Sequence, residues 1–370
     1  AQQKVAEDYL ERYRRHSKFI SYEFHDPNIE PALAQTYELS DYGLVFVSGT
    51  NRHEAAVIQE QAITTGLLRV IDDSAKKVYF VTGHGEPSPT DTSAKGYSQI
   101  AQTFMDENYQ VESLNLASAT SIPADATLVI LAGAEGELLE AEVTILDQWM
   151  ATGGKLMLLV DPFKPAPLAT TLQQYGVQWN DDLVADADNH LVGLAPTSPL
   201  IVQYPFHEIT QGLDGYLSFF PLARSITIVE SRIEARETVP LLTTGPSSWS
   251  ETNISGTALE FDEGEDTAGP VHIGIVSEDW ESGARLVVFG SNTFITNENL
   301  LNEVANRDLF MNSANWLAEA GDLISIRPKP VTPPKVFLTP LQANLTIFTT
   351  LIVIPLSIFF AGVAMWWRRR

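Results

Sequence analysis

The sequence predicts an α/β domain built on a parallel sheet and followed by one C-terminal transmembrane helix. Four apolar runs of strand length alternate with amphipathic helical segments: KKVYFVTG, TLVILAG, KLMLLVDP and ARLVVFGS. Continuous apolar strands separated by helices are typical of a parallel sheet that is covered on both faces. Further on, the stretch from Leu345 to Trp367 contains no charged residue. A helix of that length spans the ~30 Å hydrocarbon core of a bilayer.

The order of helical and strand patterns in residues 1–71 predicts a partial thioredoxin-like domain. Its opening residues are helical in pattern, and they are followed by an expected strand, a short helix and a pair of strands in KFISYEFHDP, PALAQTYEL, GLVFVSG and HEAAVI. The first strand of a thioredoxin-like arrangement has no counterpart, and the chain opens with the polar stretch AQQKVAEDYLERYRR. We therefore expect the natural protein to carry a hydrophobic N-terminal helix ahead of this segment. The chain has no cysteine, which excludes thiol redox chemistry, disulfides and thiolate metal sites.

Residues 75–325 form the expected α/β domain. Its helices are predicted in YSQIAQTFMDEN, ELLEAEVTILDQWMATG and LLNEVANRDLFMNSANWLAEA. A β-rich insertion is expected at about 170–283, with short strands in YGVQWNDDLVAD, LIVQYPFHEIT, RSITIVES and VHIGIVSE. Residues 326–341 are rich in proline and predict an extended linker. The transmembrane helix follows at 342–367, and residues 368–370 form a basic tail.

The charge distribution bears on location and partners. The chain has 23 basic and 47 acidic residues, and all of the acidic residues precede residue 327. So acidic a surface repels nucleic acid and anionic lipid, which argues against a nucleic-acid partner. Together with the absence of cysteine, it suits the bacterial periplasm.

The C-terminal helix carries the signals of a membrane boundary and of a contact surface. Three arginines directly after it favour a cytoplasmic C-terminus. Proline is tolerated in such a helix, and small residues allow close approach of a second helix in lipid. The residues expected to contact the membrane or a permease are Pro355, Ala361, Gly362, Ala364, Trp366, Trp367, Arg368, Arg369 and Arg370.

Polar residues at two strand ends are candidates for ligand binding. The GHGE stretch follows the first strand of the sheet, and ligands in open α/β sheets bind beyond the carboxyl ends of strands. Gly83 and Gly85 permit close backbone approach, while His84 and Glu86 could act as base and orienter. A tight turn with a polar edge is the alternative interpretation. Ser291 and Asn292 end another strand, so they could line the same crevice.

Catalytic and metal-binding signatures are otherwise missing. The sequence contains no G-x-S-x-G, no H-E-x-x-H and no Walker A motif. The acidic run Asp181, Asp182, Asp186 and Asp188 with His190 lacks EF-hand spacing, and we interpret it as a solvated loop. We therefore expect no cofactor and no metal.

Several motifs occur together in one order: VYFVTGHGE, LVILAG, GGKLMLLVDP, FFPLARSITI, PLLTTGPSSWSET and RLVVFGSNTFITN. With the C-terminal helix, they resemble the GldG-like (gliding-motility-type) auxiliary family of ABC transporters over nearly all of residues 10–370. The resemblance implies a central domain similar to class I glutamine amidotransferases (flavodoxin-like), here without their nucleophilic cysteine. In many relatives the motif corresponding to GSNTF carries aspartates, whereas this chain has Ser291, Asn292 and Thr293.

The resemblance also implies a location and partners. It predicts an inner-membrane protein with its bulk in the periplasm, working beside an ABC-2-type permease and a cytoplasmic ATPase. A second accessory subunit or a homodimer is a further expected partner. We expect a non-catalytic subunit that binds substrate or couples a periplasmic partner to the permease. Two alternatives stay open: a membrane-tethered hydrolase using His84 and Glu86, and a structural scaffold of an envelope complex.

Overall fold

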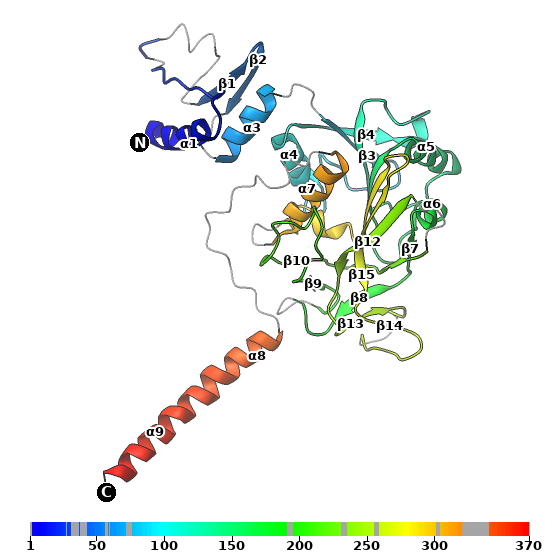
Figure 1. Ribbon diagram of the computed structural model, residues 1–370. Coiled ribbons are helices and arrows are strands. Elements are labelled where there is room, and N and C mark those ends of the chain that lie inside the picture. The colour runs from blue at the N-terminus through cyan, green and yellow to red at the C-terminus, as the bar shows by residue number, and fades with distance from the viewer. Residues whose placement is uncertain are drawn as a thin grey trace.

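The computed structural model places a central α/β body, a small N-terminal unit and a separate C-terminal helix along the chain (Figure 1). It describes residues 2–26, 28–30, 37, 43–55, 58, 60–71, 76–190, 195–230, 235–254, 259–300, 304–319 and 340–369.

In the residues that the structure describes, the N-terminal unit has two helices and a β-hairpin. Its elements are α1 (Gln2–His16), β1 (Leu44–Ser48), β2 (Asn51–Ala55) and α3 (Glu60–Ile71). The hairpin is antiparallel, and Leu10, Phe46, Ile63 and Val70 form the small buried core. Gly66 lets α3 lie directly on Phe46, because a Cβ there would meet the phenyl ring at 2.3 Å.

This unit corrects part of the sequence prediction. The opening helix and the strand pair are present. The expected strand in KFISYEFHDP is wrong, since residues 17–26 form no strand. The sequence also did not predict α3. The expected helix in PALAQTYEL lies almost wholly outside the described residues.

The body is organised around a nine-stranded mixed sheet. Its path runs β4-β3-β5-β6-β16-β15-β11-β7, and β12 pairs with β15. The parallel strands are β3 (Lys76–Thr82), β4 (Tyr109–Asn115), β5 (Ala126–Ala132), β6 (Lys155–Leu159) and β16 (Arg285–Phe289). The antiparallel strands are β7 (Val177–Trp179), β11 (Ile226–Ile228), β12 (Arg236–Thr243) and β15 (His272–Asp279).

Helices cover both faces of the sheet, as the apolar strands predict. Alternate strand residues point to opposite faces, so Val78 and Phe80 pack in one core and Tyr79 and Val81 in the other. The first core includes residues of α4 (Ser98–Asp106) and α7 (Asn306–Leu317), and the second includes residues of α5 (Glu140–Ala151) and α6 (Ala169–Gln174). Figure 1 shows α4 and α7 together and α5 and α6 apart from them.

The β-rich segment between β6 and β16 is joined to the same sheet through β7, β11, β12 and β15. Its other strands form two small sheets: β9 (Leu200–Ile201) with β10 (Ser218–Phe219), and β8 (Leu183–Asp186) with β13 (Ser248–Glu251) and β14 (Thr267–Ala268). The expected strand in LIVQYPFHEIT is therefore reduced to two residues. The short 3-10 helices are η1 (Leu116–Ser118) and η2 (Thr293–Ile295).

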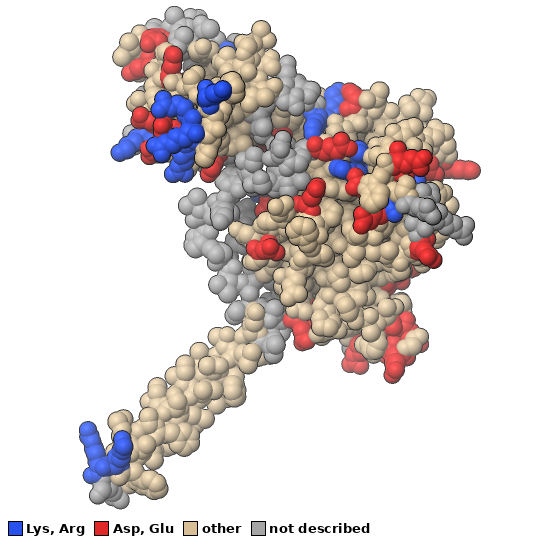
Figure 2. Space-filling model, in the orientation of Figure 1, with Lys and Arg blue, Asp and Glu red and all other residues tan. Residues whose placement is uncertain are grey.

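The C-terminal helix is continuous over Gln342–Arg368, 27 residues long, and no part of its apolar stretch is buried inside the chain. It comprises α8 (Pro340–Phe348), the π-helical turn η4 (Thr349–Val353) and α9 (Ile354–Arg368). Pro355 has no N–H to donate to the preceding turn, and the wider π turn lies directly before it. Figure 2 shows the helix free of charged side chains along its length, with basic residues gathered at its end. In length and composition this helix can cross a membrane.

Candidate functional site

The carboxyl ends of four neighbouring strands converge on one edge of the sheet. From β3 the chain crosses through α4 to β4 on one side, whereas β5 lies on the other side of β3. This reversal is a topological switch point, the place where open α/β sheets bind ligands. The loop after β3 holds His84, and the backbone N–H groups of Glu135 and Gly136, after β5, both donate to its carbonyl oxygen. The two loops at the switch point are thus bonded to each other.

His84 lies between two carboxylates at this edge. Its Nε2 is 2.9 Å from Glu142 Oε2, and its Nδ1 is 3.4 Å from Glu86 Oε1. The His84 side chain is 11% exposed, and each carboxylate side chain is 1% exposed. Gly83 and Gly85 have φ values of 129° and 92°, a region that favours glycine, and so allow the tight turn that carries the imidazole.

The remaining contacts of this cluster are structural. Glu86 Oε2 accepts a hydrogen bond from the backbone N–H of His84 at 2.7 Å. Glu142 Oε2 accepts from the N–H of Leu139 at 2.7 Å and so caps the start of α5. Among the described residues, His84 Nδ1, Glu86 Oε1 and Glu142 Oε1 are buried atoms with no hydrogen-bond partner. The imidazole thus lies between Glu86 of its own loop and Glu142 of α5, with a small part of its surface exposed.

Asn292 takes part in a second network beside the first. Its backbone N–H and its Nδ2 each donate to a carboxylate oxygen of Asp161 at 2.7 Å, and the Tyr97 hydroxyl donates to its Oδ1 at 3.0 Å. Burial raises the pKa of Asp161, although hydrogen bonds from the Asn292 backbone and from Thr293 act to lower it. Ser291 is fully buried and donates to the carbonyl of Pro221 at 3.0 Å. These polar groups are therefore occupied by intramolecular partners.

The two networks meet across the loop after β5. Gly133 has a φ of 73°, and a Cβ there would lie 2.5 Å from Asn292 Nδ2 and 3.1 Å from Pro87. Because Pro87 directly follows Glu86, the backbone of Gly133 lies between the His84 network and the Asn292 network. The structure thus brings the β3 and β16 strand ends to one edge, as their positions in the sequence led us to expect.

Sequence reasoning missed three members of this edge: Glu142, Asp161 and Tyr97. Asp161 carried a usable signal, because it ends the apolar run KLMLLVDP just as His84 follows its own strand. Glu142 carried another, as a glutamate in the first turn of a predicted helix. No sequence pattern indicated that Tyr97 faces Asn292.

Replacing Asp161 with asparagine is expected to lower the free energy of unfolding by about 1–2 kcal/mol, the effect of leaving a buried donor unsatisfied. Either orientation of the new amide places an NH2 group against a donor of Asn292. Urea unfolding followed by tryptophan fluorescence would measure the change. Asp125→Asn, at an exposed carboxylate of the same sheet, serves as the matched control. Equal unfolding midpoints for the two variants would contradict the role given to this network.

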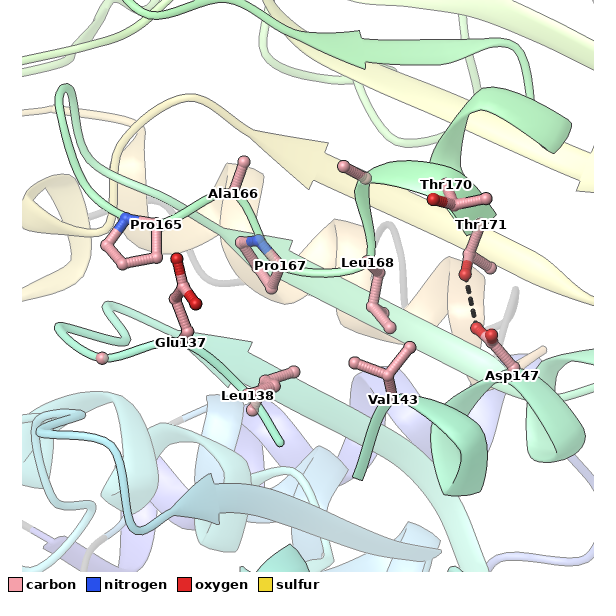
Figure 3. Close-up of a pocket in the computed structure, with 12 residues that line it drawn as sticks. Glu137, Leu138, Val143, Asp147, Pro165, Ala166, Pro167, Leu168, Thr170 and Thr171 are labelled. Atoms are coloured by element: carbon pink, nitrogen blue, oxygen red, sulfur yellow. Dashed lines mark hydrogen bonds between the residues drawn. The ribbon is translucent and has the colours of Figure 1, made fainter. Parts of the chain in front are cut away.

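A separate pocket lies beside the His84 loop, and none of the His84, Glu86, Glu142, Asp161 or Asn292 side chains lines it. This pocket has a volume of about 280 Å³ and lies between the loop after β5, the N-terminal half of α5 and the loop between β6 and α6 (Figure 3). Gly136, which bonds to the His84 carbonyl, is part of its lining. On the far wall, Leu168 has the positive φ of 55°, an uncommon conformation for a non-glycine residue.

The acidic run 181–190 contains the strand β8 (Leu183–Asp186) and the bend that follows it. Asp182 and Asp186 are buried, so the expectation of a solvated loop is wrong for these two residues. Asp182 accepts from the N–H and hydroxyl of Ser225, and Asp186 accepts from the backbone N–H groups of Asp188 and Asn189. In the described part of the chain, no group of three or more His, Cys, Asp or Glu side chains has the arrangement of a metal site.

The fold and the site define a class of protein: an α/β domain with a pocket formed by the loops after β5 and β6 at the carboxyl edge of its sheet, joined to a helix that is long and apolar enough to span a membrane. A family model described as "ABC-type uncharacterized transport system" matches residues 75–313, which is more than half of the chain. The chain therefore belongs to this family of ABC transporter auxiliary proteins.

Solved structures are similar to the chain at low sequence identity. The mmIFT52 N-terminal domain is 17% identical with a TM-score of 0.50, over 65% of this chain and 97% of that one. A ThuA-like protein of Bacteroides uniformis is 12% identical with a TM-score of 0.40, over 66% and 91%. A ThuA-like protein of Parabacteroides merdae is 10% identical with a TM-score of 0.37, also over 66% and 91%. No curated protein matches the chain.

Proposed function

We propose that this protein is a membrane-anchored, non-catalytic auxiliary subunit of an ABC-type transport system. The observation that carries the proposal is the helix Gln342–Arg368, whose apolar surface is left uncovered by the rest of the described chain. Such a surface is stable only when lipid or another apolar helix covers it. Because the chain belongs to the ABC transporter auxiliary family, we propose that the helix covering this surface is a transmembrane helix of the transporter.

In the finer form of this proposal the partners are an ABC-2-type permease and a cytoplasmic ATPase, as in GldG-like proteins. Arg368 and Arg369 at the end of α9 favour a cytoplasmic C-terminus, which places the acidic body in the periplasm at the inner membrane. We further propose an amidotransferase-like central domain at 75–325 and a partial thioredoxin-like unit at 1–71, separated from the membrane by the proline-rich linker 326–341. The binding or coupling role belongs to the carboxyl edge of the sheet.

The contacts of His84 support a non-catalytic role over that of a hydrolase. The imidazole Nε2 is engaged by Glu142, and Glu86 is buried against the backbone of its own turn. Ser291 and Asn292 likewise bond to groups of the chain itself. A general base must reach the proton that it abstracts. The pocket that is open to solvent lies beside His84, and the His84 side chain does not line it. We therefore assign the GHGE turn to support of a binding edge.

Small residues on α9 are the proposed contact with the permease. A Cβ added at Gly362 would meet nothing within 4 Å, so a partner backbone can approach the helix there. Ala361 and Ala364 flank this position, and Trp366 and Trp367 follow at the expected boundary of the membrane.

Replacing Gly362 with leucine is expected to reduce the permease recovered with the tagged full-length protein several-fold, because the added side chain separates the two helices. Co-isolation in mild detergent, quantified by mass spectrometry, would measure the change. Val363→Leu is the matched control, since it enlarges an adjacent position that is already occupied by a branched side chain. Equal recovery with both variants would contradict the contact surface. If the unmodified protein recovers neither a permease nor an ATPase, the transporter proposal itself is wrong.

A further inference from the structure

The pocket beside the His84 loop carries two carboxylates at opposite ends. Glu137 lies next to Pro165 at one end, and Asp147 lies next to Thr171 at the other (Figure 3). Thr171 donates its hydroxyl proton to Asp147 Oδ1, which holds that carboxylate at the pocket wall. The pocket is therefore negatively charged at both ends.

Neither carboxylate is neutralised by a basic side chain in the part of the chain that the structure describes. The lining contains no lysine, arginine or histidine. Lys164 is adjacent to Pro165 in sequence, but its Nζ lies 3.5 Å from Glu135 Oε1, and Glu135 is not part of the lining. Glu137 is exposed and Asp147 is half-buried, so both carboxylates are accessible to a ligand in the pocket.

Apolar side chains line the pocket between the two carboxylates. Leu138 and Val143 form one side, and Pro167 and Leu168 form the other (Figure 3). An apolar centre between two anionic ends fits a molecule of the opposite kind, with a hydrocarbon middle and a cationic group at each end. The volume of about 280 Å³ limits that molecule to a small one, because it lies just below the range of about 300–1,000 Å³ usual for small-molecule sites.

We propose that this pocket binds a short linear diamine, with one ammonium group at Glu137, the other at Asp147 and the methylene chain on the apolar wall. Charge-assisted hydrogen bonds to carboxylates hold the two ends. Burial of the methylene groups adds a hydrophobic contribution that neither inorganic cations nor polar solutes share. This assignment stands on the pocket alone and does not depend on which transporter components the protein joins.

The test is isothermal titration calorimetry of the full-length protein in detergent with 1,5-diaminopentane. We expect saturable binding that weakens as the salt concentration is raised. 1-Aminopentane is expected to bind more weakly by up to about fivefold, the effect of one solvent-exposed ion pair. The uncharged 1,5-pentanediol is expected not to bind. If the monoamine binds as tightly as the diamine, or if no saturable heat appears with the diamine, the proposal is overturned.

Variants separate the two ends of the pocket. Glu137→Gln and Asp147→Asn are each expected to weaken diamine binding about fivefold while leaving the affinity for the monoamine less affected. Glu140→Gln is the control, because it removes an exposed carboxylate of α5 that does not line the pocket. Asparagine at 147 keeps an oxygen for Thr171, and an unchanged melting temperature would show that the fold is intact. Unaltered diamine affinity in both pocket variants would refute the site.

Discussion

Replacing Arg236 with alanine is expected to lower the free energy of unfolding by about 3 kcal/mol or more, the usual cost of removing one partner of a buried ion pair. Arg236 Nε lies 2.8 Å from Asp279 Oδ2, and the two side chains are 10% and 6% exposed. They face each other across β12 and β15, in register. The guanidinium also stacks 3.9 Å from the Tyr175 ring centroid and donates to the Gln174 carbonyl at 2.8 Å. The alanine variant therefore leaves Asp279 charged and buried without its partner.

The same pair predicts a dependence of stability on pH. Burial acts to raise the pKa of Asp279, but hydrogen bonds from Arg236 and from the backbone of Ser282 and Glu281 outweigh it and hold the pKa below its ordinary value of 3.8. Because the folded pKa is lowered, the stabilisation is present above that value and is lost as the pH falls through the folded pKa. The difference between the unmodified protein and Arg236→Ala is thus expected to be full at neutral pH and to shrink below about pH 4.

Urea unfolding at several pH values would measure both effects. Lys77→Ala is a suitable control, since the ion pair of Lys77 with Asp125 belongs to the same sheet but is exposed to solvent. That variant is expected to unfold close to the unmodified protein. A loss for Arg236→Ala no larger than the control, or one that stays constant down to acidic pH, would refute the role given to this pair.

The second large effect is expected at His84. Substitution by alanine is expected to lower the free energy of unfolding by about 1–3 kcal/mol, the cost of leaving buried polar groups without their partner. The variant removes the imidazole that lies 2.9 Å from Glu142 and 3.4 Å from Glu86, and it leaves both buried carboxylates without that neighbour. It also breaks the connection between the β3 loop and the start of α5. Thermal unfolding and urea titration would both report the loss.

His84→Gln separates a structural role from a catalytic one. A glutamine amide can donate to Glu142, so it is expected to recover much of the stability, but it cannot accept a proton as a general base. If the protein were a hydrolase using His84, the glutamine variant would fold and yet lose its activity in cells. We expect it to support normal transport function instead. Full function of His84→Gln together with impaired folding of His84→Ala would establish the structural role.

Much of the body followed from the residue pattern. β3, β5, β6 and β16 are continuous apolar runs because both of their faces are buried under helices. β12 escaped prediction because its sequence RETVPLLT mixes charged residues and a proline with apolar ones, as a strand half exposed to solvent does. The sequence analysis also missed α3, whose apolar residues pack in the small core of the N-terminal unit.

The candidate site was predictable in position and not in composition. His84 and Asn292 each follow an apolar strand, and parallel strands bring their carboxyl ends to the same edge. Their partners Glu142 and Tyr97 come from helices, and the rotation of a helix on the sheet depends on side-chain packing over the whole face. The pocket likewise arises from three segments between Gly136 and Thr171 whose spacing no single segment specifies.

The sequence by itself determined that this protein has an acidic α/β body, a proline-rich segment after it and an apolar helix able to cross a membrane. These features are encoded locally, in runs of similar residues that take up their structure wherever apolar surface is buried or lipid is near. Only the tertiary structure decided that the His84 side chain of the GHGE turn lies between Glu142 and Glu86, and that the exposed pocket lies one loop away, between Glu137 and Asp147. Such pairings depend on distances between segments far apart in the chain, which are set when the helices pack on the sheet.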